Sequence, residues 1–387
     1  MAQRRNGTRG RRLIFGPALT AAVALAAAGC TSASHGTRSA SAADGISAPA
    51  VTLAQARQVF DRYVAATAAA AAPHSASSVV SLVTGVERAV LSATLRLHSI
   101  VVSGSPSSSS GAYNSSLSAE PDFEQYTYGS PAFYLPAAAS YPRFFVASAS
   151  RTLRGTKAAD GRTTQLGGVP VPVDGPALLL FSKASADAPW LLASVSQLPS
   201  GVTPPKLATD SAGYIPTMPL SDAALLAQPD DTGPLQAAVV DDGPASTATR
   251  AVADGPLTTG MYQGARNHAD GMTAPHGDVY QWELAGSSLP EFALRTAAGG
   301  ALVFYAMTLT TTVAVPDVIN KASPIHSGPP IEVPLDLQML LPKGQPAPLV
   351  QLQSQQLLSF AAIDPAQGTA KLQVLAIGGG VTSASAS

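Results

Sequence analysis

The sequence predicts an α+β fold, because the spacing of its apolar residues changes along the chain. After position 51 apolar side chains recur every three or four residues, which is the spacing of one helix face. From about position 133 apolar and polar residues tend to alternate, as in half-buried strands. We therefore expect helices packed on curved antiparallel sheets.

Two amphipathic helices are expected at the start of the folded part. Thr52 is a suitable N-cap, and the helix after it carries an apolar face that includes Phe60. A second helix is expected over 77–100, where Val and Leu recur at helical spacing. Weaker helical signals, interrupted by prolines, occupy 221–226 and 235–240.

Strands are expected where the alternation is clearest, and the pair over 177–182 and 191–198 forms a hairpin. The second half repeats this order of helices and strands, which predicts an internal duplication. The alternative is that any two alternating hairpins align equally well. The expected strands are 133–135, 144–150, 177–182, 191–198, 279–284, 292–296, 301–315, 331–341, 349–363 and 370–377.

The first thirty residues predict a lipoprotein signal peptide. Five arginines precede an uncharged run over 13–28, and small residues lead to Cys30, the only cysteine. Lipid is attached through a thioether, so a thiol is required at this junction. A cleaved signal with an incidental cysteine is the alternative. The run of sixteen residues is shorter than the ~20 needed to span a bilayer.

The export route stays open between the general secretory and twin-arginine pathways, because Arg11 and Arg12 precede two apolar residues after one intervening position. Residues after Cys30 are rich in Ser and Ala and indicate a flexible tether. The expected organisation is a signal peptide (1–29), a disordered tether (30–50), two α+β domains (51–205 and 206–380) and a disordered tail (381–387).

Composition excludes some partners. Only 12% of residues are charged, about half the ~25% usual in soluble domains. Five of the 23 basic residues lie in the leader, so 18 remain against 24 acidic residues after cleavage. A mildly acidic chain is not expected to bind nucleic acid or anionic lipid through basic patches. With Cys30 lipidated, no disulfide can form, so the core alone must provide stability.

The lipidation motif, the tether, the helix around Phe60 and the segments Leu178–Phe181 and Trp190–Val195 resemble a group of actinobacterial secreted lipoproteins. The resemblance implies two NTF2-like units, in which helices pack on a curved antiparallel sheet to make a cone. It implies an envelope location and carries no activity with it.

Histidine and carboxylate residues form one local cluster, at His268, Asp270, His276 and Asp278. Imidazole and carboxylate groups are suitable metal ligands or acid–base groups, so a site is one interpretation. The other is a polar loop leading into the strand at Val279. The spacing of eight residues between the histidines fixes no geometry, so we expect no metal site and no cofactor here.

No other motif indicates catalysis. The sequence lacks a G-x-S-x-G nucleophile elbow. The pairs Asp230-Asp231 and Asp241-Asp242 are interpreted as solvated turn residues. The aromatic residues are interpreted as core: Phe133, Tyr134, Phe144, Phe145, Trp190, Trp282, Phe304 and Tyr305.

The function expected from the sequence is therefore a non-enzymatic binding or scaffold module, held by the lipid on Cys30 at the extracytoplasmic face of the cell membrane. An envelope protein is the expected partner. The first alternative is a binder of a small hydrophobic ligand or lipid, using the cavity of a cone. The second, an envelope hydrolase or isomerase, requires an Asp–His or Asp–Tyr pair in a cone.

Overall fold

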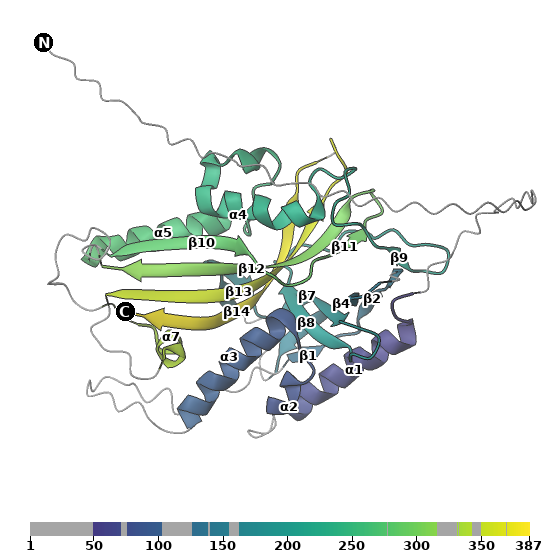
Figure 1. The fold of residues 1–387 in the computed structure, drawn as a ribbon, viewed down its shortest axis with the longest axis horizontal. Coiled ribbons are helices and arrows are strands. Elements are labelled where there is room, and N and C mark those ends of the chain that lie inside the picture. The colour runs from purple at the N-terminus through teal and green to yellow at the C-terminus, as the bar shows by residue number, and fades with distance from the viewer. Residues whose placement is uncertain are drawn as a thin grey trace, which may run out of the picture. The chain divides into compact units, whose positions relative to one another are not determined.

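One antiparallel sheet of ten strands runs through both halves of the chain in the computed structural model (Figure 1). This confirms the expected α+β class with a large antiparallel sheet. The first half denotes residues up to 205, and the second half denotes residues from 206 onward. The structure describes residues 49–70, 76–102, 126–137, 140–154, 162–276, 278–315, 331, 333–342, 350–368 and 370–387.

The strands agree well with the alternating segments of the sequence. They are β1 (Tyr126–Tyr128), β2 (Ala132–Tyr134), β3 (Pro136–Ala137), β4 (Arg143–Leu153), β5 (Thr163–Leu166), β6 (Val169–Pro172), β7 (Gly175–Lys183), β8 (Leu191–Gln197), β9 (Ile215–Pro216), β10 (Val279–Gly286), β11 (Phe292–Arg295), β12 (Ala301–Ala314), β13 (Gln351–Asp364) and β14 (Gln373–Ala386). The large sheet has the order β1-β4-β7-β8-β14-β13-β12-β10, with β2 beside β4 and β11 beside β12. β3 pairs with β9, and β5 with β6, in two small sheets.

Most helices precede the long strands of their half, whereas the last helix lies between β12 and β13. They are α1 (Leu53–Ala69), α2 (Ala76–Val80), α3 (Gly85–Val102), α4 (Thr232–Asp242), α5 (Thr259–His276) and α7 (Leu335–Leu340), with 3-10 turns at Pro229–Asp231, Gly243–Ala245 and Thr247–Arg250. Within the described ranges, no helix is both long enough and apolar enough to cross a bilayer.

α1 begins where the sequence indicates. The Thr52 hydroxyl accepts a hydrogen bond from the Gln55 backbone N–H, and the Gln55 side chain accepts one from the Thr52 N–H. This capping box satisfies two backbone donors that the first turn leaves free. It fixes the start of the helix, so that Phe60 and Tyr63 face the sheet.

Aromatic rings fill the interior of the first half. Phe145 of β4 stacks on Phe181 of β7, with ring centroids 4.8 Å apart, and packs edge-on against Trp190 at 5.2 Å. Phe60 of α1 reaches the same group, 6.5 Å from Phe181. α1 and α2 therefore cover one face of β4, β7 and β8.

The helix expected over 77–100 is interrupted, which corrects that prediction. The Leu82 carbonyl accepts from the Leu192 N–H at 2.9 Å, and the Thr84 N–H donates to the Leu192 carbonyl at 2.8 Å. The segment between α2 and α3 thus pairs with β8. Gly85 begins α3 with φ +53°, a left-handed conformation that favours glycine.

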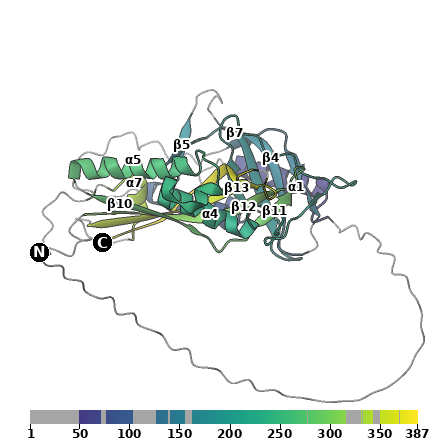
Figure 2. The same cartoon turned by 90° about the horizontal axis from the view of Figure 1, so that it is seen from above.

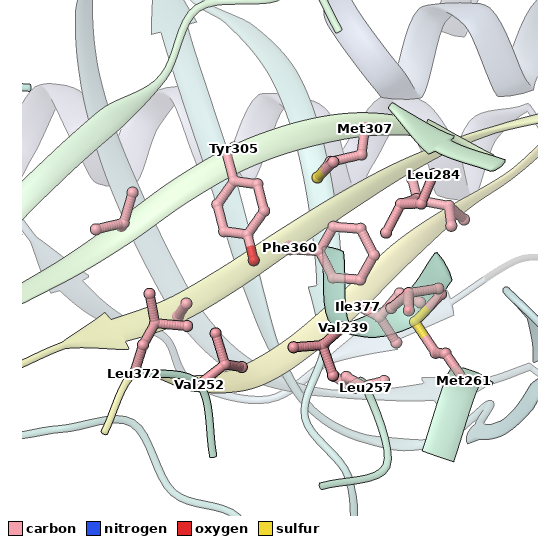
Figure 3. Close-up of a cluster of buried hydrophobic side chains, with 14 of the residues drawn as sticks. Val239, Val252, Leu257, Met261, Leu284, Tyr305, Met307, Phe360, Leu372 and Ile377 are labelled. Atoms are coloured by element: carbon pink, nitrogen blue, oxygen red, sulfur yellow. The ribbon is translucent and has the colours of Figure 1, made fainter. Parts of the chain in front are cut away.

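In the second half, α4 and α5 cover one face of the long strands β12, β13 and β14. Figure 3 shows Phe360, Tyr305 and Met307 pointing from the sheet into this core, with Met261 beside them. The Tyr305 hydroxyl donates to the Gln236 side chain at 2.7 Å, which satisfies the polar end of a buried ring.

A third apolar cluster joins the two halves. Phe144 of β4 packs on Phe292 of β11, with ring centroids 4.4 Å apart. Leu178 and Leu180 of β7 belong to the same cluster as Leu375 of β14. Strands from both halves therefore pack face to face and share one core. The predicted domain boundary between 205 and 206 stays a prediction.

The expected strand over 331–341 is wrong, because α7 occupies 335–340. Apolar residues alternate there in the sequence, yet Pro334 precedes a helical turn. The turn places Leu337 and Leu341 four positions apart on one face, against Val313 and Leu352. Burial of two leucines in one cluster thus overrides the period-two pattern.

Two further expectations differ from the structure. Residues 221–226 do not form a helix, because Leu225 forms a β-bridge with Ala366. The disordered tail expected over 381–387 is instead mostly strand, since β14 continues to Ala386 beside β13. The helical signal over 235–240 is confirmed by α4.

The crossing of β14 over β8 leaves no room for a side chain at Gly378. A Cβ atom there would overlap the Val195 carbonyl oxygen of β8. We expect Gly378→Ala to lower the free energy of unfolding by about 2–4 kcal/mol, because the two backbones must separate. Thermal unfolding followed by circular dichroism measures this change.

Gly286→Ala is the matched control, since a Cβ atom at Gly286 meets nothing within 4 Å. We expect its stability to stay within about 0.5 kcal/mol of the parent protein. Equal melting temperatures for the two variants would contradict the assigned crossing.

Candidate functional site: a cavity beneath helix α5

A cavity of about 850 Å³ lies between α5 and the sheet of the second half. Its floor consists of β10, β12, β13 and β14, and its roof is α5, which Figure 2 shows extended along the sheet. The turn between β5 and β6 lines one end, and the segment around α7 lines the other. Volumes of about 300–1,000 Å³ are typical of small-molecule sites.

Cross-strand register arranges the floor in rows. Trp282, Thr311 and Ser354 lie opposite one another on β10, β12 and β13 and form a middle row. One row outward, Val313 lies opposite Leu352, and one row inward, Leu309 lies opposite Gln356. The floor is thus largely apolar, with hydroxyl groups in its middle.

The middle row contains a direct hydrogen bond between hydroxyl groups. Thr311 Oγ1 and Ser354 Oγ are 2.7 Å apart. Tyr280 lies beside this pair, and burial raises the pKa of its phenol, while a hydrogen bond with Thr311 opposes the increase. The phenol therefore stays protonated near neutral pH, and the row provides uncharged donors and acceptors.

The roof helix was missed by sequence reasoning, because Gly271 and Pro275 resemble a loop. α5 extends to His276, and the expected loop leading to Val279 is wrong over most of its length. The side chains facing the cavity follow helical spacing at Met261, Gly264, Ala265, His268, Gly271 and Met272. That spacing was the signal available in the sequence.

The roof is held close to the β5–β6 turn by two glycines. A Cβ atom at Gly264 would lie 2.5 Å from the Gly168 carbonyl oxygen, so only glycine allows this approach. The Gly167 N–H donates to the Gln356 side chain of the floor at 3.1 Å. The turn is therefore attached to both roof and floor and closes one end of the cavity.

The histidine and carboxylate cluster is divided by the structure. His268 and Asp278 line the cavity. Asp270 instead forms an exposed pair with Arg266 at 3.8 Å. The His276 side chain lies outside the described residues. In the described part of the chain, no three His, Cys, Asp or Glu side chains come together as a metal site would require.

His268 contacts an aromatic ring instead of a nucleophile. Its ring lies edge-on to Tyr280, with centroids 4.6 Å apart. The Ser354 hydroxyl is hydrogen-bonded to Thr311. Catalysis by an activated serine needs a hydrogen bond between nucleophile and base.

Two residues for which the sequence suggested another role lie in or near the cavity. Trp282 was interpreted as core, and Asp241 was interpreted as a solvated turn residue. Trp282 lines the cavity, and its indole N–H donates to the Val240 carbonyl at 3.1 Å. Asp241 accepts from the Leu284 N–H at 3.0 Å, so it is not a solvated turn residue. Burial raises its pKa to about 6, and the hydrogen bond from Leu284 opposes the increase.

A second titratable cluster lies in the first half, without a cavity described beside it. Glu87 of α3 accepts from the Val195 N–H of β8 at 2.9 Å. Burial raises its pKa to about 7, and the nearby Arg151 limits the increase. Tyr63 and Tyr128 lie near this carboxyl, and burial raises their pKa values as well.

Cys30, the residue expected to carry lipid, lies outside the described residues. The sequence profile of one family, DUF8094, described as a domain of unknown function, matches residues 47–386. The chain therefore belongs to this family. No match was found among curated proteins or among solved structures.

We expect Glu87 to make folding more favourable at acidic pH. Its pKa is about 7 in the folded protein and 4.5 ordinarily, so the folded state retains the proton longer. The contribution of this proton to the free energy of unfolding is fully present below pH 4.5 and is lost as the pH rises through 7. Between pH 5 and pH 8 the free energy of unfolding should fall by about 2 kcal/mol through this group.

Glu87→Gln should remove that part of the pH dependence of stability, because an amide does not titrate. Its side-chain oxygen can still accept the hydrogen bond from the Val195 N–H. Chemical denaturation at pH 5 and pH 8 measures this pH dependence. Asp61→Asn, on the exposed face of α1, is the matched control and should leave the dependence unchanged. An unchanged slope in Glu87→Gln would contradict the role of this carboxyl.

Proposed function

We propose that this member of the DUF8094 family is a membrane-anchored extracytoplasmic lipoprotein that binds a small apolar ligand in the cavity beneath α5. The proposal describes a non-catalytic binding module, attached to the membrane through a lipid on Cys30. The cavity supports ligand binding more strongly than a purely structural scaffold, because a scaffold has no need for a partly hollow core.

The cavity is the observation that carries the proposal. Here about 850 Å³ is lined by apolar groups such as Leu309, Val313 and Leu352, with a few convergent hydroxyl and amide groups. Apolar walls with a few placed polar groups are typical of small-molecule sites.

The arrangement of each half supports the NTF2-like part of the proposal. In the first half, helices cover the strands β4, β7 and β8, and in the second they cover β12, β13 and β14. We propose two NTF2-like units packed back to back through the cluster around Phe144 and Phe292. The unit of the second half is the one that retains a hollow.

Filling the cavity should abolish binding of an uncharged dye. Ser354→Phe adds a large ring at the middle of the floor, and we expect at least a tenfold weaker binding of N-phenyl-1-naphthylamine. Dye fluorescence during titration measures the affinity, and circular dichroism checks the fold.

Gln353→Phe is the matched control, because adjacent residues of a strand point to opposite faces of the sheet. We expect it to bind the dye as the parent protein does. Equal loss of binding in both variants, or no loss in either, would contradict the cavity as the binding site.

The membrane anchor is tested separately. Cys30→Ser removes the thiol needed for a thioether, so we expect the protein to move from the membrane fraction to the soluble extracytoplasmic fraction. Immunoblotting of fractionated cells measures this. Retention of Cys30→Ser in the membrane, or a native protein whose mass includes the intact leader, would contradict lipid anchoring.

A further inference from the structure

The charge of the cavity wall restricts which ligands it can accept. No lysine or arginine is among the described residues that line it. Arg266 of α5 lies on the exposed side, where it pairs with Asp270. In the described part of the wall, a buried carboxylate or phosphate head group would therefore meet no lysine or arginine, and burial of an unpaired charge is strongly unfavourable.

Asp278 also lines the cavity. Its side chain is buried, with 9% of the residue exposed, and it lies before β10 at the outer end of the cavity. The cavity thus combines one buried carboxyl group with apolar walls.

The polar groups that remain are suited to an uncharged oxygen. The hydroxyls of Thr311 and Ser354 lie next to each other, 2.7 Å apart, and each can donate and accept. Apolar residues lie on both sides of this pair, at Leu309 and at Val313. Along β12 the pattern is therefore apolar, hydroxyl and apolar, while on β13 the hydroxyl lies between Leu352 and Gln356.

We propose that the cavity selects uncharged amphipathic lipids, meaning an aliphatic body that carries a hydroxyl or ester oxygen, and excludes fatty-acid anions. The ligand oxygen binds the Thr311–Ser354 pair, and the aliphatic body lies along the apolar rows. This inference rests on the proposed ligand-binding function and adds the chemical class of the ligand.

The test uses a single-tryptophan protein. Trp190→Phe leaves Trp282 on the cavity floor as the one tryptophan, since the chain has two. Energy transfer from Trp282 to bound N-phenyl-1-naphthylamine reports occupancy of the cavity. Decanol, decanoate and decylammonium, which share one chain length, then compete with the dye at pH 8.

We expect decanol to displace the dye at a concentration at least tenfold lower than decanoate or decylammonium. Decanoate or decylammonium binding as tightly as decanol overturns the inference and leaves the proposed function intact. No binding of the dye or of any of the three probes overturns the proposed function and the inference together.

Removal of the hydroxyl groups tests the polar contact. The double variant with Thr311→Val and Ser354→Ala should bind decanol about fivefold more weakly and should bind the dye with unchanged affinity. Thr310→Val is the matched control, because position 310 points to the opposite face of β12 and does not line the cavity. Unchanged decanol affinity in the double variant, or an equal loss in Thr310→Val, overturns the assigned contact.

Discussion

The close crossing of β14 over β8 is the constraint on which the cavity depends. Glycine at 378 allows the backbone to lie directly against the Val195 carbonyl, and the hydroxyls of Ser196 and Ser359 meet nearby at 3.0 Å. Small groups at the crossing bring the two halves together. As a result the β5–β6 turn of the first half reaches the cavity of the second half, where Gly167 binds Gln356.

The two halves differ in how their interiors are filled. In the first half, stacked rings such as Phe145 and Phe181 occupy the space between helices and sheet. In the second half, α5 presents Gly264, Ala265 and Gly271 to the floor. Small side chains on α5 fill little of the space between the helix and the sheet. The contact between Gly264 and Gly168 fixes how far α5 lies from the sheet. The hollow is therefore a consequence of which side chains α5 carries.

Local sequence pattern was sufficient for much of the fold. Thr52 indicated the start of α1, and alternation placed β12 and β13 to within two residues, although it ended β14 at 377 instead of 386. It failed where tertiary contacts compete with local preference. Pairing of Leu82 with Leu192 divides a continuous helical pattern, and burial of Leu337 in a cluster turns an alternating segment into a helix.

The candidate site was less accessible to sequence reasoning. His268 and Asp278 were identified as a cluster, but their common cavity required a helix over residues that resemble a loop. The adjacency of Thr311 and Ser354 depends on the register of β12 and β13, which lie more than forty positions apart. A shift of β13 by one residue would move the Ser354 hydroxyl to the opposite face, away from Thr311, and no local pattern excludes it.

Only 12% of the residues in this chain are charged, and the described lining of the cavity contains no lysine or arginine. Both ion pairs found among the described residues are long, at 3.8 and 3.9 Å, and such surface pairs contribute little. Buried carboxyl groups at Glu87, Glu291 and Asp364 have pKa values raised mainly by burial, to about 7, 7 and 6. Desolvation raises these pKa values because it disfavours the charged form of each carboxyl group. The same interior would disfavour the charged head group of a ligand, so selection for uncharged molecules follows from the composition of the whole core.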